Sequence, residues 1–115
     1  MAKTFQHQII ARAVELISDE RRWTVGAMAR NAQRQSCSAY TTEAVRFCAI
    51  GALTRAVFEL LGPPSNPDLA NQIEAMVLAA NGHERTNLAC INDRQGREAI
   101  LELLRKVLVG ISGQT

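Results

Sequence analysis

The segment 42–61 constrains the fold most, because it is apolar on nearly every side when it is drawn as a helix. Beyond Thr42 and Glu43 in its first turn, its charged positions are only Arg46, Arg55 and Glu59. A helix with this pattern is expected at the centre of a protein, covered by other helices. Gly62 and the two prolines that follow predict its end, since glycine favours the cap conformation and proline lacks an amide hydrogen.

Three further helices are expected where apolar residues recur at helical spacing. The first covers 3–18, the second covers 67–80 and ends at Asn81-Gly82, and the last runs to Ile111. Short polar side chains at helix starts predict the caps. The expected caps are Thr41 or Thr42 for the central helix, Ser65 or Asn66 for the next, and Asn92 or Asp93 for the last.

The remaining segments carry weaker patterns. A short helix over 24–32 is expected after a Thr24 cap, although Gly26 weakens it, and 33–40 is expected to be a loop. Residues 83–91 fit either a helical turn or a short extended piece. The sequence therefore predicts an all-α fold, a compact bundle of four main helices plus one or two short ones. Residues 1–115 would form a single domain with a frayed tail over 112–115.

Composition narrows the class of protein. Apolar residues make up 47% and charged residues 21% of the 115 residues, which is typical of globular rather than disordered chains. No apolar run is long enough for a membrane span, and the start lacks a secretion signal, so we expect a cytoplasmic protein without a membrane partner. Cys37, Cys48 and Cys90 are odd in number and lack C-x-x-C spacing, so no disulfide, metal or cofactor is expected.

The basic residues are concentrated between positions 21 and 42, where the chain has four arginines and no acidic residue. Trp23 and Tyr40 add aromatic surfaces on which bases could stack. Such a tract can bind nucleic-acid phosphates, but it is also typical of an ordinary solvated surface. The candidate nucleic-acid contacts are Arg21, Arg22, Arg30 and Arg34.

A cysteine-dependent hydrolase is a second chemical alternative. Cys48, His83 and Asn92 or Asp93 occur in the order nucleophile, base and orienting residue, as in papain-like enzymes. However, Cys48 is expected about a turn and a half inside the central helix, where an apolar environment would raise its thiol pKa. The favoured interpretation is structural. Cys48 and Gly51 would let a neighbouring helix approach closely, Asn92 and Asp93 would cap a helix, and the two histidines, at positions 7 and 83, would be solvated.

Three motifs occur in a fixed order along the chain. They are Trp23-Thr24-x-Gly26-Ala27-x-Ala29, then Ala44-x-Arg46-Phe47-Cys48-Ala49-x-Gly51-Ala52-Leu53, and finally Asn87 with Ile91-Asn92-Asp93. Over residues 9–110 this pattern resembles a family of small bacterial and phage proteins known only as a domain of unknown function, with W-C-A, G-A-L and N-D motifs. Phe47 departs from the tryptophan that this family usually carries. The resemblance implies no activity, and it marks Trp23, Phe47, Cys48, Gly51, Asn92 and Asp93 as motif residues.

We therefore expect a non-enzymatic domain that acts by binding another protein or itself. The segments 42–61 and 98–111 offer more apolar surface than a small bundle hides, and a homodimer would cover the surplus. Three alternatives stay open. They are a phage or mobile-element inhibitor of a host defence system, a nucleic-acid-binding module that uses the Arg21–Arg34 tract, and the Cys48 hydrolase.

Overall fold

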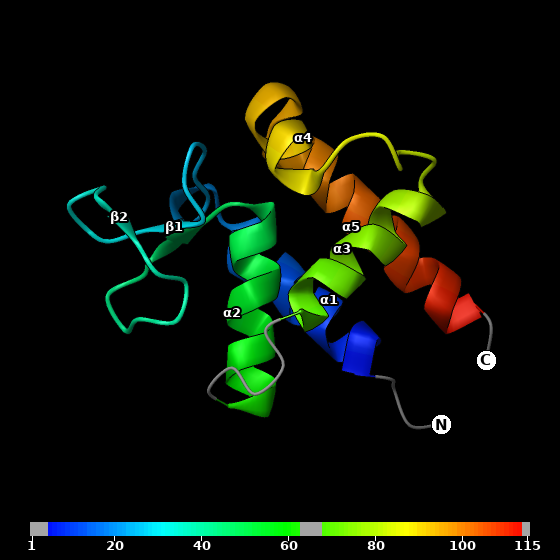
Figure 1. Ribbon diagram of the computed structural model, residues 1–115, viewed down its shortest axis with the longest axis horizontal. Coiled ribbons are helices and arrows are strands. Elements are labelled where there is room, and N and C mark those ends of the chain that lie inside the picture. The colour runs from blue at the N-terminus through cyan, green and yellow to red at the C-terminus, as the bar shows by residue number, and fades with distance from the viewer. Residues whose placement is uncertain (1–4, 63–67, 114–115) are drawn as a thin grey trace.

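The computed structural model describes residues 5–62 and 68–113, and this part of the chain forms five α-helices, a short 3-10 helix and three two-residue strands (Figure 1). In chain order the elements are α1 (Phe5–Ser18), η1 (Glu20–Arg22), β1 (Ala29–Arg30), β2 (Ser36–Cys37), β3 (Arg46–Phe47), α2 (Ala49–Leu61), α3 (Leu69–Ala80), α4 (Leu88–Gln95) and α5 (Arg97–Gly113). The fold is mostly helical, as expected, but it also contains a sheet.

Helix α2 occupies the centre of the helical part. It packs against α1 and α3, while α1 and α4 also pack against α5. Figure 1 shows α2 between the sheet on one side and α1 and α3 on the other. The largest side chains that are fully buried come from all five α-helices, which share one apolar core. They include Ile9, Ile10, Ile17, Leu53, Ile73, Leu88, Ile100 and Leu104.

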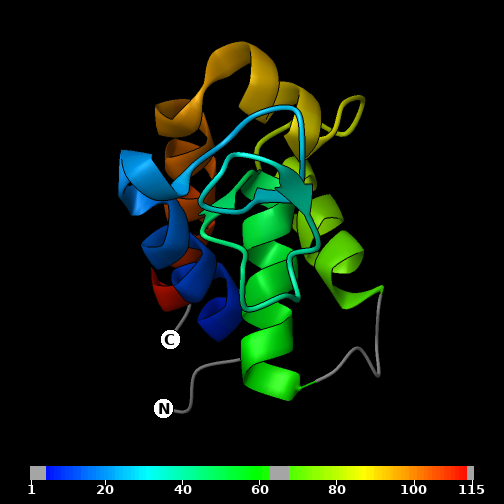
Figure 2. The ribbon, with the colours of Figure 1, turned by 90° about the vertical axis from the view of Figure 1, so that its left-hand side faces the viewer.

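The segment 23–47 corrects the all-α prediction. It crosses in front of α2 in Figure 2 and forms an antiparallel sheet of order β2-β1-β3. The expected helix over 24–32 is wrong, because Gly26 adopts a positive φ of 76° and the chain then enters β1. The turn into β2 is closed by Asn31, whose Oδ1 accepts hydrogen bonds from the backbone N–H groups of Gln33 and Gln35. Local side-chain bonds of this kind compete with helix formation.

The central helix begins later than the sequence predicts. Thr41 and Thr42 do not cap it, and α2 starts only after Cys48, whose Sγ accepts the Gly51 N–H at 3.4 Å. The reason is that residues 45–48 form hydrogen bonds with β1 and with Met28, the residue before β1. Val45 N–H donates to Arg30 O, and Cys48 N–H donates to Met28 O. Amides used in this way are not available for a helix.

The helix ends around α4 also differ from the prediction. Asn92 and Asp93 lie inside α4 and do not cap α5, which begins after Gly96 at a φ of 90°. The α4 cap is Asn87, whose Oδ1 accepts the Cys90 N–H. Helix α3 ends at Asn81 as expected, whereas the predicted caps and first residue of that helix, Ser65, Asn66 and Pro67, lie outside the described residues.

The sequence predicts that both histidines are solvated, but the structure exposes only one of them. His83 is exposed in the connection between α3 and α4. His7 is only 9% exposed, which corrects the prediction for α1. The end of α2 lies beside it, since His7 borders a hollow together with Glu59 and Leu60. Sequence periodicity within α1 cannot show this contact, because it depends on how α1 crosses α2.

The carboxylate of Glu59 links α1 to α2, so we expect the stability of the fold to depend on pH. Glu59 accepts hydrogen bonds from Arg12 at 2.7 Å and from Arg55 at 3.0 Å. Burial acts to raise the pKa of Glu59, but the two guanidinium groups outweigh it and lower that pKa. A lowered pKa stabilises the fold above the unfolded-state pKa, and this contribution is lost as the pH falls through the folded-state pKa.

We therefore expect Glu59→Gln to cost up to about 1 kcal/mol at pH 7, because the ion pairs are partly exposed, and much less near pH 3. Urea unfolding at the two pH values measures the difference. Glu84→Gln, in the exposed connection between α3 and α4, serves as the control. An equal cost for Glu59→Gln at both pH values would contradict the assignment.

Candidate functional site

The buried amide of Asn92 connects three parts of the chain. Its Oδ1 accepts the indole Nε1–H of Trp23 at 2.7 Å and the backbone N–H of Ala49 at 3.0 Å. Its Nδ2 donates to Thr24 O at 3.0 Å and to Asp93 Oδ1 at 3.1 Å. A side-chain amide has two donor hydrogens and one acceptor oxygen with two lone pairs, so Asn92 is fully used. The residue joins α4 to the start of α2 and to the segment after η1.

Asp93 extends this connection to the surface. Its Oδ1 also accepts the backbone N–H of Gly26 at 3.2 Å, while the residue itself is exposed. Gly26 is at a positive φ that side-chain-bearing residues rarely adopt. The consecutive polar pair of the third motif therefore holds the segment that leads into β1.

Gly51 has the close-packing role that the sequence predicts, although its neighbour is not a helix. A Cβ atom at this position would lie 1.8 Å from the backbone oxygen of Met28. The same oxygen accepts the backbone N–H of Cys48. The lack of a side chain at Gly51 lets the segment before β1 lie directly on the first turn of α2.

The geometry gives no support to the cysteine hydrolase. Cys48 is only 3% exposed, and burial raises the pKa of its thiol, so the sulfur stays protonated near neutral pH. Its position as the cap of α2 corrects the prediction that it lies inside the helix. His83 borders a hollow that Gln95 and Lys106 also line and that Cys48 does not. The side-chain amide of Asn92 already forms all of its hydrogen bonds. The structure therefore does not assemble Cys48, His83 and Asn92 as nucleophile, base and orienting residue.

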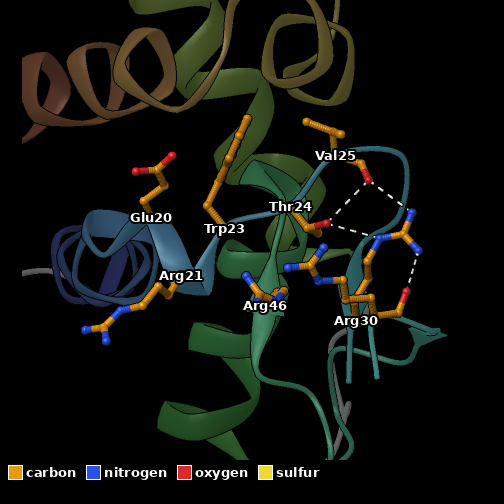
Figure 3. Close-up of a pocket in the computed structure, with 8 residues that line it drawn as sticks. Glu20, Arg21, Trp23, Thr24, Val25, Arg30 and Arg46 are labelled. Atoms are coloured by element: carbon orange, nitrogen blue, oxygen red, sulfur yellow. Dashed lines mark hydrogen bonds between the residues drawn. The ribbon is translucent and has the colours of Figure 1, made fainter. Parts of the chain in front are cut away.

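A hollow of about 610 Å³ lies beside Trp23, between η1 and the strands β1 and β3 (Figure 3). Four of its eight lining residues are arginines and one is a glutamate. The lining residues are Glu20, Arg21, Trp23, Thr24, Val25, Arg30, Arg34 and Arg46. Three of the four arginines that the sequence marks as phosphate contacts thus meet at one site. The fourth, Arg22, is exposed and does not line it.

The four lining arginines differ in their partners. Arg21 pairs with Asp19 at 2.9 Å, and Figure 3 shows its side chain directed away from Arg30 and Arg46. The hydrogen bonds that Arg21 donates to the Asp19 carboxylate lower the pKa of Asp19 to about 2. Within residues 5–62 and 68–113, Arg30, Arg34 and Arg46 form no ion pair. Their charges therefore face the hollow without a matching anion.

Arg30 is held in place by neutral oxygens. Its Nε donates to Thr24 Oγ1 at 3.1 Å, and its terminal nitrogens donate to Arg34 O at 3.0 Å and Val25 O at 3.2 Å (Figure 3). These bonds fix the guanidinium group against the segment that surrounds it. None of the three acceptors carries a negative charge, so the site keeps the full charge of Arg30.

Arg46 is the most unusual member of the group. It lies directly opposite Arg30 in the β1–β3 register, an arrangement of like charges that destabilises a sheet. Within the described part of the chain, its buried Nε has no hydrogen-bond acceptor. A buried donor without an acceptor costs free energy and calls for an explanation. An anion in the hollow would offset the repulsion between Arg30 and Arg46.

Sequence reasoning missed Arg46 because it placed this residue in the central helix. The only signal would have been the pairing of β1 with β3, and two-residue strands carry no readable alternation. Tyr40, proposed with Trp23 as a stacking surface, does not line the hollow. Its ring packs edge-on against Phe58 with ring centres 5.4 Å apart. Trp23 is thus the only aromatic residue at this site.

Two further classes of site, a metal centre and a membrane-spanning helix, are absent from the described residues. Among them, no group of three or more His, Cys, Asp or Glu side chains is placed to hold a metal ion. No helix in residues 5–62 and 68–113 combines the length and apolar character needed to cross a bilayer.

The fold and this hollow define a mainly helical domain with a small sheet and an arginine-lined site. The chain belongs to a family of unknown function (DUF6197), whose model matches residues 1–108. No curated protein and no solved structure matches the chain. Membership of a domain family of unknown function is therefore confirmed. The W-C-A, G-A-L and N-D motifs of that family, a bacterial or phage origin and a role against host defence stay predictions.

Proposed function

We propose that the protein is a binding module that holds a phosphate-bearing ligand in the arginine-lined hollow. The observation that carries the proposal is the set of three arginines without ion pairs, Arg30, Arg34 and Arg46, around one hollow. Arg46 lies directly opposite Arg30, and an anion would offset the repulsion between these two like charges.

Phosphate suits this arrangement better than a carboxylate. A guanidinium group presents paired N–H donors that match two oxygens of a phosphate or a carboxylate. Three positive charges of Arg30, Arg34 and Arg46 and one negative charge of Glu20 leave the lining at +2, besides the Arg21–Asp19 pair, and a single carboxylate would balance only half of that charge. A phosphate monoester carries close to two charges near neutral pH and offers three oxygens. The hollow also falls within the range of about 300–1,000 Å³ that is usual for ligand pockets.

The first test removes the charge of Arg46 and keeps its aliphatic stem. We expect Arg46→Met to weaken the binding of inorganic pyrophosphate by about tenfold or more, since a hydrogen bond to a charged group is worth roughly 1.5–3 kcal/mol. The free energy of unfolding without ligand should stay equal or rise, because the repulsion with Arg30 is relieved. Isothermal titration calorimetry and urea unfolding measure the two quantities.

The matched control is Arg105→Met, which removes an exposed arginine of α5 outside this hollow. It should leave pyrophosphate binding unchanged at constant ionic strength. Equal affinity in the Arg46 and Arg105 variants would contradict the proposal. A loss of stability of more than about 1 kcal/mol in Arg46→Met would instead assign Arg46 a purely structural role.

Binding to another protein or to a second copy of the chain stays a prediction. The argument for it was a surplus of apolar helix surface. Within the described side chains of the segments 42–61 and 98–111, the large apolar residues that are exposed are Val45, Leu60, Leu61 and Val109. The surplus of apolar helix surface is therefore smaller than the sequence pattern indicated. Light scattering at increasing concentration tests self-association, and a strict monomer would contradict it.

A further inference from the structure

Trp23 borders the arginine-lined hollow in a fixed orientation. Its only polar atom, the indole Nε1, is bound to Asn92 at 2.7 Å, and the residue is half-buried. Figure 3 shows the indole standing between Glu20 and Val25. Because the polar edge is already satisfied, the part of the indole that lines the hollow offers only ring surface to a ligand. Planar groups such as nucleobases stack on such surfaces in a sequence-tolerant way.

Glu20 places one negative charge among the lining residues of the hollow. It is the only acidic residue that lines the hollow, and its carboxylate has no ion pair or side-chain hydrogen bond within the described residues. A carboxylate would repel a ligand made only of phosphate groups. It would favour a ligand that also carries an amino group, as cytosine does at N4, where Glu and Asp side chains accept hydrogen bonds.

We infer that the phosphate-bearing ligand is a nucleoside phosphate unit, with its base against Trp23 and its phosphate near Arg30, Arg34 and Arg46. This inference rests on the proposed function and adds the class of ligand. The unit is either a free mononucleotide or one residue of a single strand, since both have the same chemistry. The bases of a duplex are paired and stacked, so their faces are not available to Trp23.

The position of Glu20 adds a preference among bases. Figure 3 shows its carboxylate beside the indole, on the opposite side from Val25. The exocyclic groups of a base lie in its own plane, so a base stacked on the indole meets the Glu20 carboxylate only through the edge that extends beyond the indole. Cytosine and adenine present an amino group there, whereas thymine and uracil present a carbonyl oxygen, which a carboxylate repels. Amino-bearing bases should therefore bind more tightly than thymine.

The experiment uses the fact that Trp23 is the only tryptophan of the chain, so intrinsic fluorescence reports on this site alone. Titrations use inorganic phosphate, cytidine monophosphate, short oligocytidylate and oligothymidylate strands, and a duplex of the same length. We expect a cytidine-containing ligand to quench the emission and to bind about tenfold more tightly than inorganic phosphate, because stacking contributes roughly that much per base. A preference for the strand over the mononucleotide would assign the ligand to nucleic acid.

Glu20→Gln provides a variant with opposite expected effects on two ligands. It should bind inorganic phosphate more tightly, because a negative charge is removed from the hollow, and it should reduce the preference for cytidine over thymidine. Glu15→Gln, an exposed residue of α1 outside the hollow, is the control and should change neither. Glu20 is exposed and its side chain forms no bond that the fold needs, so this variant should fold normally.

The outcomes separate the two proposals. If neither phosphate, pyrophosphate nor any nucleotide binds, the proposed function itself is wrong. If phosphate binds and Arg46→Met weakens that binding as expected, but nucleotides bind no more tightly and leave the fluorescence unchanged, only the nucleoside inference is wrong. A duplex that binds as tightly as the single strand would also overturn this inference, because it would show that the backbone alone is recognised.

Discussion

Asn92→Ala is expected to lower the free energy of unfolding by roughly 3–5 kcal/mol, the largest effect of any polar substitution in the described chain. The change leaves the Trp23 Nε1–H, the Ala49 N–H and the Thr24 carbonyl without partners. Asn92 itself is completely buried, so water does not replace these bonds while the fold is intact. Each buried polar group that loses its partner costs about 1–3 kcal/mol.

Urea unfolding followed by circular dichroism measures this loss, with Asn71→Ala as the control on the exposed side of α3. The Asn71 variant should stay within about 0.5 kcal/mol of the parent protein. A similarly small effect for Asn92→Ala would show that the four hydrogen bonds do not hold α4 to the rest of the fold. Asn92→Asp tests the donors separately, because a carboxylate keeps the acceptor oxygens and cannot donate to Thr24 O.

Gly51→Ala is expected to destabilise the protein by about 3 kcal/mol or more, although alanine is normally the better helix residue. The added Cβ would lie 1.8 Å from the backbone oxygen of Met28, so the main chain itself has to move. Movement there also disturbs the bond from Cys48 N–H to Met28 O. Overpacking that forces side chains and backbone to shift typically costs about 1–3 kcal/mol, occasionally more, and a direct overlap with a backbone oxygen belongs at the upper end.

The matched control is Gly110→Ala in α5, where an added Cβ meets no atom within 4 Å. This variant should gain about 0.5–1 kcal/mol, because alanine loses less backbone entropy than glycine in a helix. The two substitutions are chemically identical and are expected to differ in sign. Thermal unfolding of both variants measures the contrast, and a gain in stability for Gly51→Ala would rule out the close approach.

The helical part of the fold could be predicted from the sequence because apolar spacing within one segment is local information. The first helix was expected over 3–18 and forms over Phe5–Ser18, and the apolar segment that ends at Leu61 does form the central helix. The start of that helix could not be predicted. It depends on bonds from Val45 and Cys48 to Arg30 and Met28, which are distant in sequence.

The candidate site, too, could be predicted only where its signal lies within one segment of the chain. A run of arginines without acidic residues is visible in the sequence, and Arg21, Arg30 and Arg34 indeed line one hollow. The role of Arg46 depends on its register opposite Arg30, which no single segment reveals. Asn92 was expected as a cap because polar residues before an apolar helix usually have that role. Three of its four partners, Trp23, Thr24 and Ala49, lie more than forty positions away.

The bond between Asn92 and Trp23 has a consequence for how this domain responds to a ligand. The indole that borders the hollow and the backbone at the start of α2 share one acceptor oxygen on α4. A ligand that restrains the indole therefore also restrains α4 and the first turn of α2, and local opening of either helix releases the indole. Occupancy of the hollow and local opening of these two helices are thus thermodynamically coupled, even though neither helix supplies a lining residue.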